Sequence, residues 1–243
     1  MSNARKFGMI VGIAALMAGC VPTSDATQSA PDKPSKPTSS TPSKLNSQTL
    51  ARNFVDVVER TEPVAEQVCR EQTTGMNCDF RIVVDDRPNQ PPNAYQTLDK
   101  SGRPIIAFTV GLIAQARNKD ELAFVMGHEA AHHVQNHLGR QRQAASAGAI
   151  VFGGLATLTG VSGSGVETAQ RLGAAVGARS FSKEFELEAD GLGTIITHRA
   201  GFDPVRGSQF FGRIPDPGDR FLGTHPPNAA RLETVRRVAA GLK

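Results

Sequence analysis

Two histidines one helical turn apart constrain this chain more than any other feature of its sequence. They are His128 and His132, within GHEAAHHVQNH at residues 127–137. Residues four apart on an α-helix lie about 40° from one another, so both imidazoles project from one face and can hold one ion. Glu129 lies at the edge of that face. This HExxH pattern requires a helix and is typical of a zinc site with a glutamate as general base.

The other two histidines of the segment point elsewhere on such a helix. His133 lies about 140° from His128, and His137 about 180° from it. We therefore interpret both as surface or packing residues. The helix that carries them is predicted to begin after Asn118, a favourable N-cap residue, and to end at Gly139.

A catalytic zinc takes three protein ligands and leaves one position for water, so another segment must supply the third ligand. The carboxylates of EFELEAD are candidates. Glu186 and Asp190 share one helix face, so that Glu186 can bind the ion while Asp190 accepts the remaining N–H of His128. Spacing alone leaves two alternatives open: the pair Glu184 and Glu188, or an exposed acidic face without a metal.

The remaining patterns predict a mostly helical α+β domain. Apolar residues at helical spacing cover residues 47–72, where Pro63 breaks the helix or starts a turn. The β-branched runs FRIVVDD and RPIIAFTVGLI predict two strands, the second continuing into a helix near Leu112. Further helices are expected over residues 182–201, from Pro204 and from Asn228. We expect a small antiparallel sheet of three or four strands over the zinc helix.

Glycine and alanine dominate residues 144–178, which include an apolar patch from Ala149 to Leu158. This composition predicts two short, closely packed helices or a hairpin. The patch is too short for a membrane span. We interpret it as a core segment, and contact with a membrane or cover for the active site is the alternative.

The first 19 residues have the pattern of a secretory signal: Arg5 and Lys6, then an apolar stretch, then Gly19 and Cys20. A small residue followed by cysteine is the pattern of a bacterial lipoprotein signal, which predicts that Cys20 is lipidated and becomes the mature N-terminus. An ordinary cleaved peptide with an incidental cysteine is the alternative. Val21 favours the outer membrane.

Three regions follow from this division: the signal at residues 1–19, the lipidated cysteine with a tether at 20–46, and a domain at 47–243. The tether is rich in Pro, Ser, Thr and Lys and has few apolar residues, which predicts disorder. The chain has a net charge of +4, and without residues 1–19, which hold two basic residues, it has +2. The sequence has no cluster of basic residues that would predict nucleic acid as a partner.

Cys69 and Cys78 remain, nine residues apart. In an oxidising periplasm such a pair predicts a disulfide. Zinc binding by the pair is the alternative, although the tight CxxC spacing and a second cysteine pair are missing.

The motifs in combination resemble one family. HExxH, a later ExxAD (Glu186, Ala189 and Asp190), the preceding NKDELAFVMGHE and the closing THPPNAARL are similar to CAAX prenyl endopeptidase/HtpX-like zinc metallopeptidases, particularly their soluble periplasmic lipoproteins. The resemblance runs from about residue 80 to residue 235. It implies a zincin-like domain with one Zn²⁺ per chain, Glu186 as the third ligand and Asp190 as the partner of a ligand.

The resemblance also implies roles outside the two zinc helices. Asn93, Ala94 and Tyr95 stand where the family tends to have NAF, on a strand near the cleft that binds substrate. His225 is expected near the zinc, where it either donates a hydrogen bond to the developing oxyanion or occupies the open position. Capping of the last helix region is the alternative for His225, and Arg231 is expected to hold that loop.

Two departures from the family stand out: QTLDKSGRP after Tyr95, in place of a short Gly turn, and the absence of long membrane helices. The first bears on the shape of the substrate strand. The second favours a soluble, tethered domain.

These features predict a zinc-dependent endopeptidase in which Glu129 acts as general base toward a zinc-activated water. By resemblance, its substrates are unfolded or misfolded envelope proteins. The expected location is the periplasm of a Gram-negative bacterium, with Cys20 as an anchor in the outer membrane. One alternative is a latent zinc-bound chaperone or assembly partner, and another is a hydrolase of cell-wall peptide. The oligomeric state stays open.

Overall fold

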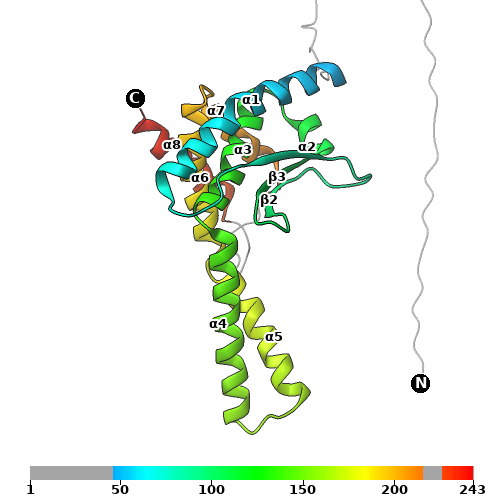
Figure 1. Ribbon diagram of the computed structural model, residues 1–243, viewed down its shortest axis with the longest axis vertical. Helices are drawn as coiled ribbons and strands as arrows, with labels where there is room; N and C mark the ends of the chain where they lie inside the picture. Colours follow the sequence, from blue (N-terminus) through cyan, green and yellow to red (C-terminus); the bar gives the residue numbers. More distant parts are fainter. Residues whose placement is uncertain (1–45, 216–225, 243) are drawn as a thin grey trace, which may run out of the picture. The chain divides into compact units, whose positions relative to one another are not determined.

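The computed structural model describes residues 46–215 and 226–242, which form a mostly helical α+β domain with one small sheet, as expected (Figure 1). The predicted signal, Cys20, the tether up to residue 45 and His225 lie outside the described residues. In chain order the elements are α1 (Ser47–Gln72), β1 (Arg81–Asp85), β2 (Ala94–Leu98), β3 (Pro104–Thr109), α2 (Val110–Gln115), α3 (Lys119–Val134), α4 (His137–Leu158), α5 (Ser164–Arg179), α6 (Ser182–Arg199), α7 (Pro204–Ser208), the 3-10 helix η1 (Gln209–Arg213) and α8 (Asn228–Ala240).

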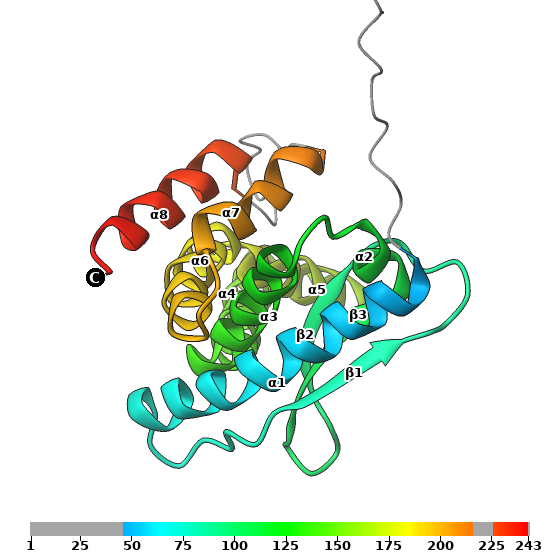
Figure 2. The ribbon, with the colours of Figure 1, turned by 90° about the horizontal axis from the view of Figure 1, so that it is seen from above.

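Helix α1 is continuous, and the expected break at Pro63 is wrong. A proline inside a helix removes one hydrogen bond and costs about 3 kcal/mol. The apolar face of α1 offsets this cost, because Phe54, Val57 and Val68 are buried in the core. The ring of Phe54 lies 5.1 Å from that of Phe108 on β3, and the view from above shows α1 lying across the sheet (Figure 2).

The sheet has three strands in the order β1-β3-β2. β2 pairs with β3 antiparallel through the turn between Leu98 and Pro104, whereas β1 pairs with β3 parallel. The expectation of an antiparallel sheet is therefore wrong for one pair. The reason is that QTLDKSGRP supplies a hairpin turn and the end of strand β2, which the residue pattern alone did not indicate, so β1 and β3 are not consecutive. β2 is left as an edge strand, and the sheet packs against α3.

The helix of the HExxH motif ends earlier than expected. Asn118 caps α3 by accepting a hydrogen bond from the backbone N–H of Glu121, as predicted. The helix stops at Val134, however, and Gly139 lies inside α4. Asn136 has φ 54°, in the left-handed region that asparagine tolerates better than most residues, and it redirects the chain.

Helices α4 and α5 lie side by side and extend away from the other helices (Figure 1). The prediction of a closely packed helical pair over residues 144–178 is confirmed. Its interpretation as a core segment is wrong, because Ile150, Val151, Leu155 and Leu158 are all exposed. Among the helices of the described residues, none combines the length and the apolar character needed to cross a membrane.

A disulfide joins Cys69 near the end of α1 to Cys78, with Cα atoms 5.7 Å apart. Both cysteines are buried. The pairing favoured by the sequence is thus the one present in the structure, and it ties α1 to the segment before β1.

Candidate metal centre

Helix α3 supplies two of the three groups that converge at the candidate metal centre. The Nε2 atoms of His128 and His132 lie 3.0 Å apart, as expected for residues four apart on one helix face. His128 is buried and His132 is partly buried.

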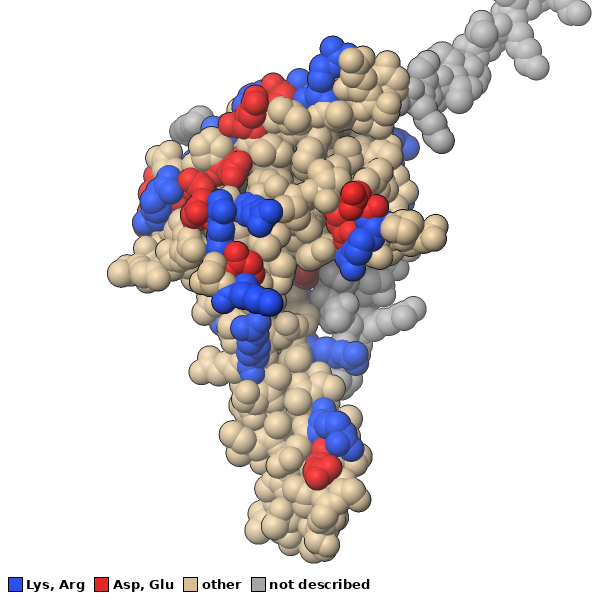
Figure 3. All heavy atoms as spheres, turned by 45° about the vertical axis from the view of Figure 1, so that its right-hand side comes forward, with Lys and Arg blue, Asp and Glu red and all other residues tan. Residues whose placement is uncertain are grey.

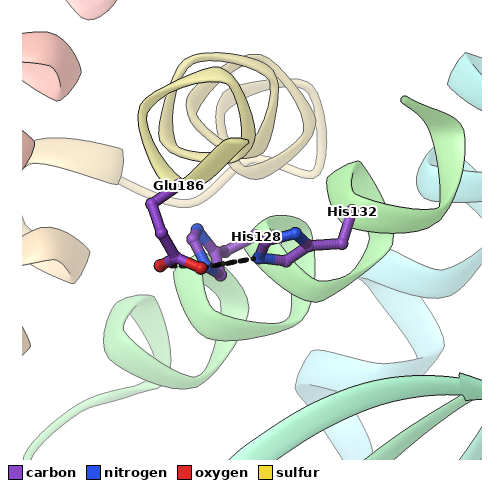
Figure 4. A group of neighbouring side chains, drawn as sticks. All are labelled: His128, His132 and Glu186. Atoms are coloured by element: carbon purple, nitrogen blue, oxygen red, sulfur yellow. Dashed lines mark hydrogen bonds and ion pairs between the residues drawn. The ribbon is translucent and has the colours of Figure 1, made fainter. Parts of the chain in front are cut away.

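Helix α6 supplies the third group. The carboxylate oxygens of Glu186 lie 3.5 Å from His128 Nε2 and 3.4 Å from His132 Nε2 (Figure 4). One ligand atom from each of the three residues fits within a 4.8 Å spread. Of the alternative pair, Glu184 is exposed and Glu188 contacts other residues, so within the described chain the geometry favours Glu186.

The two helices cross in backbone contact next to the site. A Cβ atom added at Gly193 of α6 would lie 2.8 Å from the backbone N of His128, and one added at Gly127 would lie 2.9 Å from the carbonyl oxygen of Gly193. Only glycine permits this approach. The contact brings Glu186 and Asp190 within reach of His128.

Asp190 and Arg231 hold His128 from behind. Asp190 Oδ1 lies 2.9 Å from His128 Nδ1, as the sequence predicted. Arg231 donates two hydrogen bonds to the same carboxylate, at 2.7 and 2.8 Å, and its guanidinium stacks on the ring of Phe211. Arg231 is buried and also lies 3.5 Å from Glu186. The sequence predicts only that Arg231 holds the loop of His225, because no spacing signal links Arg231 to Asp190.

These contacts set the charges of the buried groups. Burial raises the pKa of Asp190, but the hydrogen bonds from Arg231 and His128 lower this pKa by more than burial raises it. The net pKa is therefore lowered, and the carboxylate is ionised. Burial and Arg231 lower the pKa of His128, whereas hydrogen bonds to Asp190 and Glu186 outweigh them and raise it to about 9 in the metal-free protein. A metal ion that bound here would therefore have to displace a proton from His128.

His137 is a functional candidate that helical spacing missed. Because α3 ends before His137, this residue is the first of α4. His137 is buried, and its Nδ1 lies 2.8 Å from His132 Nδ1. Its Nε2 lies 3.1 Å from Glu188, which also accepts from Arg140, and its ring stacks on Phe185. The expectation that His137 points away from the site is wrong for this reason.

The protonation of these groups follows from their contacts. The hydrogen bond from Arg140 lowers the pKa of Glu188, so its carboxylate only accepts and His137 Nε2 carries the proton. Burial lowers the pKa of His137 to about 4, so its Nδ1 keeps a lone pair and accepts the Nδ1–H of His132. The Nε2 of His132 is then free to bind a metal.

His133 packs in the core, as expected. Its Nε2 lies 2.7 Å from the carbonyl oxygen of Asn77, and its ring meets Phe80 edge to face.

A cleft of about 560 Å³ opens over the three converging side chains. Glu129, half-buried, lines it together with His128 and His132. The predicted substrate-strand residues Asn93, Ala94 and Tyr95 line it too, at the start of edge strand β2. The hydroxyl of Tyr95 donates to Asp85 at 3.3 Å. The catalytic glutamate and the substrate strand predicted from the sequence thus share one cleft.

Comparisons with known proteins agree with this geometry. The sequence model of Peptidase family M48 matches residues 53–239. A putative beta-barrel assembly-enhancing protease of Vibrio cholerae serotype O1 is 33% identical over 132 residues, which cover 50% of this chain and 26% of that protein. The beta-barrel assembly-enhancing proteases of Yersinia pestis and Escherichia coli (strain K12) are both 32% identical, over 145 and 141 residues. These matches cover 52% and 53% of this chain and 29% of each relative. The matched part of this chain thus spans less than a third of the length of these relatives.

Proposed function

Because the chain belongs to peptidase family M48 and is a metalloprotease, we propose that it is a zinc-dependent endopeptidase acting on unfolded or misfolded envelope proteins. The observation that carries the proposal is the convergence of His128, His132 and Glu186 in the cleft that also holds Glu129 and the edge strand β2.

The donor set fits zinc. Two imidazole nitrogens and one carboxylate form a common protein ligand set of catalytic zinc sites and leave a position open. We propose that His128, His132 and Glu186 hold one Zn²⁺ per chain. When bound, this ion supplies Lewis-acid chemistry, polarising a carbonyl and lowering the pKa of water.

Glu129 is the proposed general base. Its carboxylate follows His128 directly on α3 and faces the cleft. In peptide hydrolysis it takes a proton from the attacking water and passes it to the nitrogen of the leaving amine, so that no covalent intermediate is needed. Asp190 and His137 keep the proton on the Nδ1 atom of each imidazole ligand.

The edge of β2 is the proposed binding site for substrate. An extended peptide adds to an exposed strand through main-chain hydrogen bonds, which depend little on sequence and suit unfolded polypeptides. Since the relatives are named for enhancing β-barrel assembly, we extend the proposal to a protease that acts in envelope protein assembly.

The proposed location is the periplasm of a Gram-negative bacterium. The signal at residues 1–19 and Cys20 support a lipid anchor, and Val21 favours the outer membrane. The disulfide between Cys69 and Cys78 is consistent with an oxidising compartment. His225 retains its proposed role near the zinc.

The test is casein cleavage by the zinc-loaded protein Lys44–Lys243, compared with Glu129→Gln. We expect the variant to bind zinc as the wild type does and to lose at least about a hundredfold in cleavage rate, because the general base is gone. Glu184→Gln, which removes an exposed carboxylate of α6, is the matched control and should cleave normally.

Equal cleavage by wild type and Glu129→Gln would contradict the mechanism. Zinc bound to both proteins without any cleavage would instead favour the latent chaperone or assembly partner.

A further inference from the structure

The hairpin of α4 and α5 displays large apolar side chains to its surroundings. Six of the ten exposed large hydrophobic side chains that the structure describes lie between Ile150 and Leu172. Leu158 at the end of α4 is 86% exposed, and Ile150 is 74% exposed. Isolated exposed leucines are common, but a concentration of them on one projection marks an interaction site.

The two helices pack through their small residues. At Gly148, Gly173 and Gly177 an added Cβ would collide with the backbone of the opposite helix. Ile150, Val151, Leu155 and Leu158 fall within an arc of about 140° at 100° per residue, and all four stay exposed outside this seam. A helix pair in water normally buries its large apolar residues and exposes its polar ones. Small residues between helices and large apolar residues outside are the arrangement that lipid favours.

The distribution of charged residues along the hairpin also favours contact of its end with lipid. Residues 143–166 contain no Asp, Glu, Lys, Arg or His. On the face that Figure 3 displays, the end of the projection is tan, without charged residues, except for one adjacent blue and red pair. Over the whole lengths of α4 and α5, the Asp, Glu, Lys and Arg residues are four arginines and one glutamate: Arg140, Arg142, Arg171, Arg179 and Glu167.

We propose that the free end of this hairpin, residues 150–172, inserts into the surface of a lipid bilayer with anionic headgroups. Arg171 lies seven residues after Ser164, about 10 Å along α5 at 1.5 Å per residue. This distance matches the depth of about 5–10 Å that interfacial helices reach. At that depth Leu158 and Val161 enter the acyl region and Arg171 lies among the headgroups, with Glu167 3.8 Å from it.

A second copy of the chain suits the hairpin less well. Two hairpins packed side by side in the same direction would bring their arginines together, whereas anionic headgroups neutralise them. The insertion does not depend on the proposed hydrolysis, and it places the catalytic domain at the membrane independently of Cys20.

The chain contains no tryptophan, so a single introduced tryptophan reports on its own position. We would place it at Leu158 in one protein and, as a control, at Val55 on α1, which is 52% exposed. The protein Lys44–Lys243 is used because it holds the whole described core and lacks the predicted anchor. The probe is vesicles of phosphatidylethanolamine with phosphatidylglycerol.

We expect Leu158→Trp fluorescence to shift to the blue with vesicles and to be quenched by brominated lipid, and Val55→Trp to do neither. The same response at both positions, or none at Leu158→Trp, would overturn the proposal. A blue shift that grows with protein concentration in the absence of vesicles would overturn it in favour of a second copy.

A second measurement removes the apolar end. Leu155→Glu/Leu158→Glu should lower the vesicle partition coefficient by at least about tenfold, since two apolar side chains are lost from the inserted end. Val55→Glu/Val110→Glu, at exposed apolar positions of α1 and α2, is the matched control and should keep the wild-type coefficient. An unchanged coefficient in the first variant would contradict insertion. Casein cleavage without vesicles, measured on all these proteins, tests the peptidase proposal separately.

Discussion

At the scale of single residues, the two imidazoles of the candidate centre are each held by a partner at Nδ1. Asp190 accepts from His128, and His137 accepts from His132. Both contacts leave Nε2 directed toward Glu186. The second contact is the less expected one, because it uses a neutral histidine whose own proton is fixed by Glu188.

His137→Leu should weaken zinc binding by about ten- to a hundredfold, because the Nδ1–H of His132 loses its acceptor. His137→Asn places an amide oxygen near the same position and should recover part of the affinity. Competition with a chromophoric chelator measures the dissociation constant of zinc without relying on activity.

His133→Leu, which alters the adjacent buried histidine of α3, is the control for packing damage. It should lower the free energy of unfolding and leave zinc affinity unchanged. Zinc binding by His137→Leu at wild-type strength would contradict the role assigned to His137.

Zinc affinity should rise with pH. The pKa of His128 is about 9 in the metal-free protein, so below that pH a proton occupies the imidazole and competes with the ion. The apparent dissociation constant of zinc should fall by about tenfold per pH unit from pH ~6.5 to ~8.5 on account of this one proton. In Asp190→Asn, which lacks one of the contacts that raise this pKa, the dependence should be shallower.

Residue spacing predicted part of the site. His128, His132 and Glu129 follow from helix geometry, whereas the choice of Glu186 over Glu184 needed the family resemblance. Arg231 and His137 could not be placed, because their roles depend on how α8 packs on α6 and on where α3 breaks. The prediction for His225 stays untested.

At the scale of elements, the contact between Gly127 and Gly193 determines how far apart the ligand helices lie. The three nearest neighbours of a Cβ at Gly193 are all backbone atoms, from His128 and Gly127. No side-chain movement can make room, so a larger residue must push α6 away from α3.

Gly193→Ala should therefore lower the free energy of unfolding by about 1–3 kcal/mol and also weaken zinc binding. Gly191→Ala, two residues earlier on α6, meets its nearest neighbour at 3.9 Å and is the matched control. It should be neutral or stabilising by up to about 1 kcal/mol, since alanine favours the helix. Chemical denaturation measures both, and equal stability of the two variants would refute the argument.

Local patterns predicted elements better than their pairing. The α1 region was recognised by its apolar spacing, but not its continuity through Pro63, which depends on burial in the core. β1 and β3 were recognised by their β-branched residues. β2 was expected only from the family resemblance, because AYQTL combines polar residues with a short length. Without the position of β2, the residue pattern gave no reason to expect β1 to pair parallel with β3.

At the scale of the whole molecule, the fold class and the family followed from the combination of motifs, and both are confirmed. Arrangement in space was harder to predict. Residues 144–178 have the composition of a buried segment, yet they project from the domain, because packing through glycine leaves their large apolar residues outside.

The ends of that projection are close together. Gln141 on α4 donates to the carbonyl oxygen of Ala178 on α5 at 3.4 Å. The chain thus leaves the candidate metal centre after α3, runs out along α4 and back along α5, and returns to the centre at α6. Loop-closure entropy changes only slowly with loop length. The part of the hairpin beyond Gln141 and Ala178 is therefore able to vary in length and surface without disturbing the contacts that His137 and Arg140 make at the candidate centre.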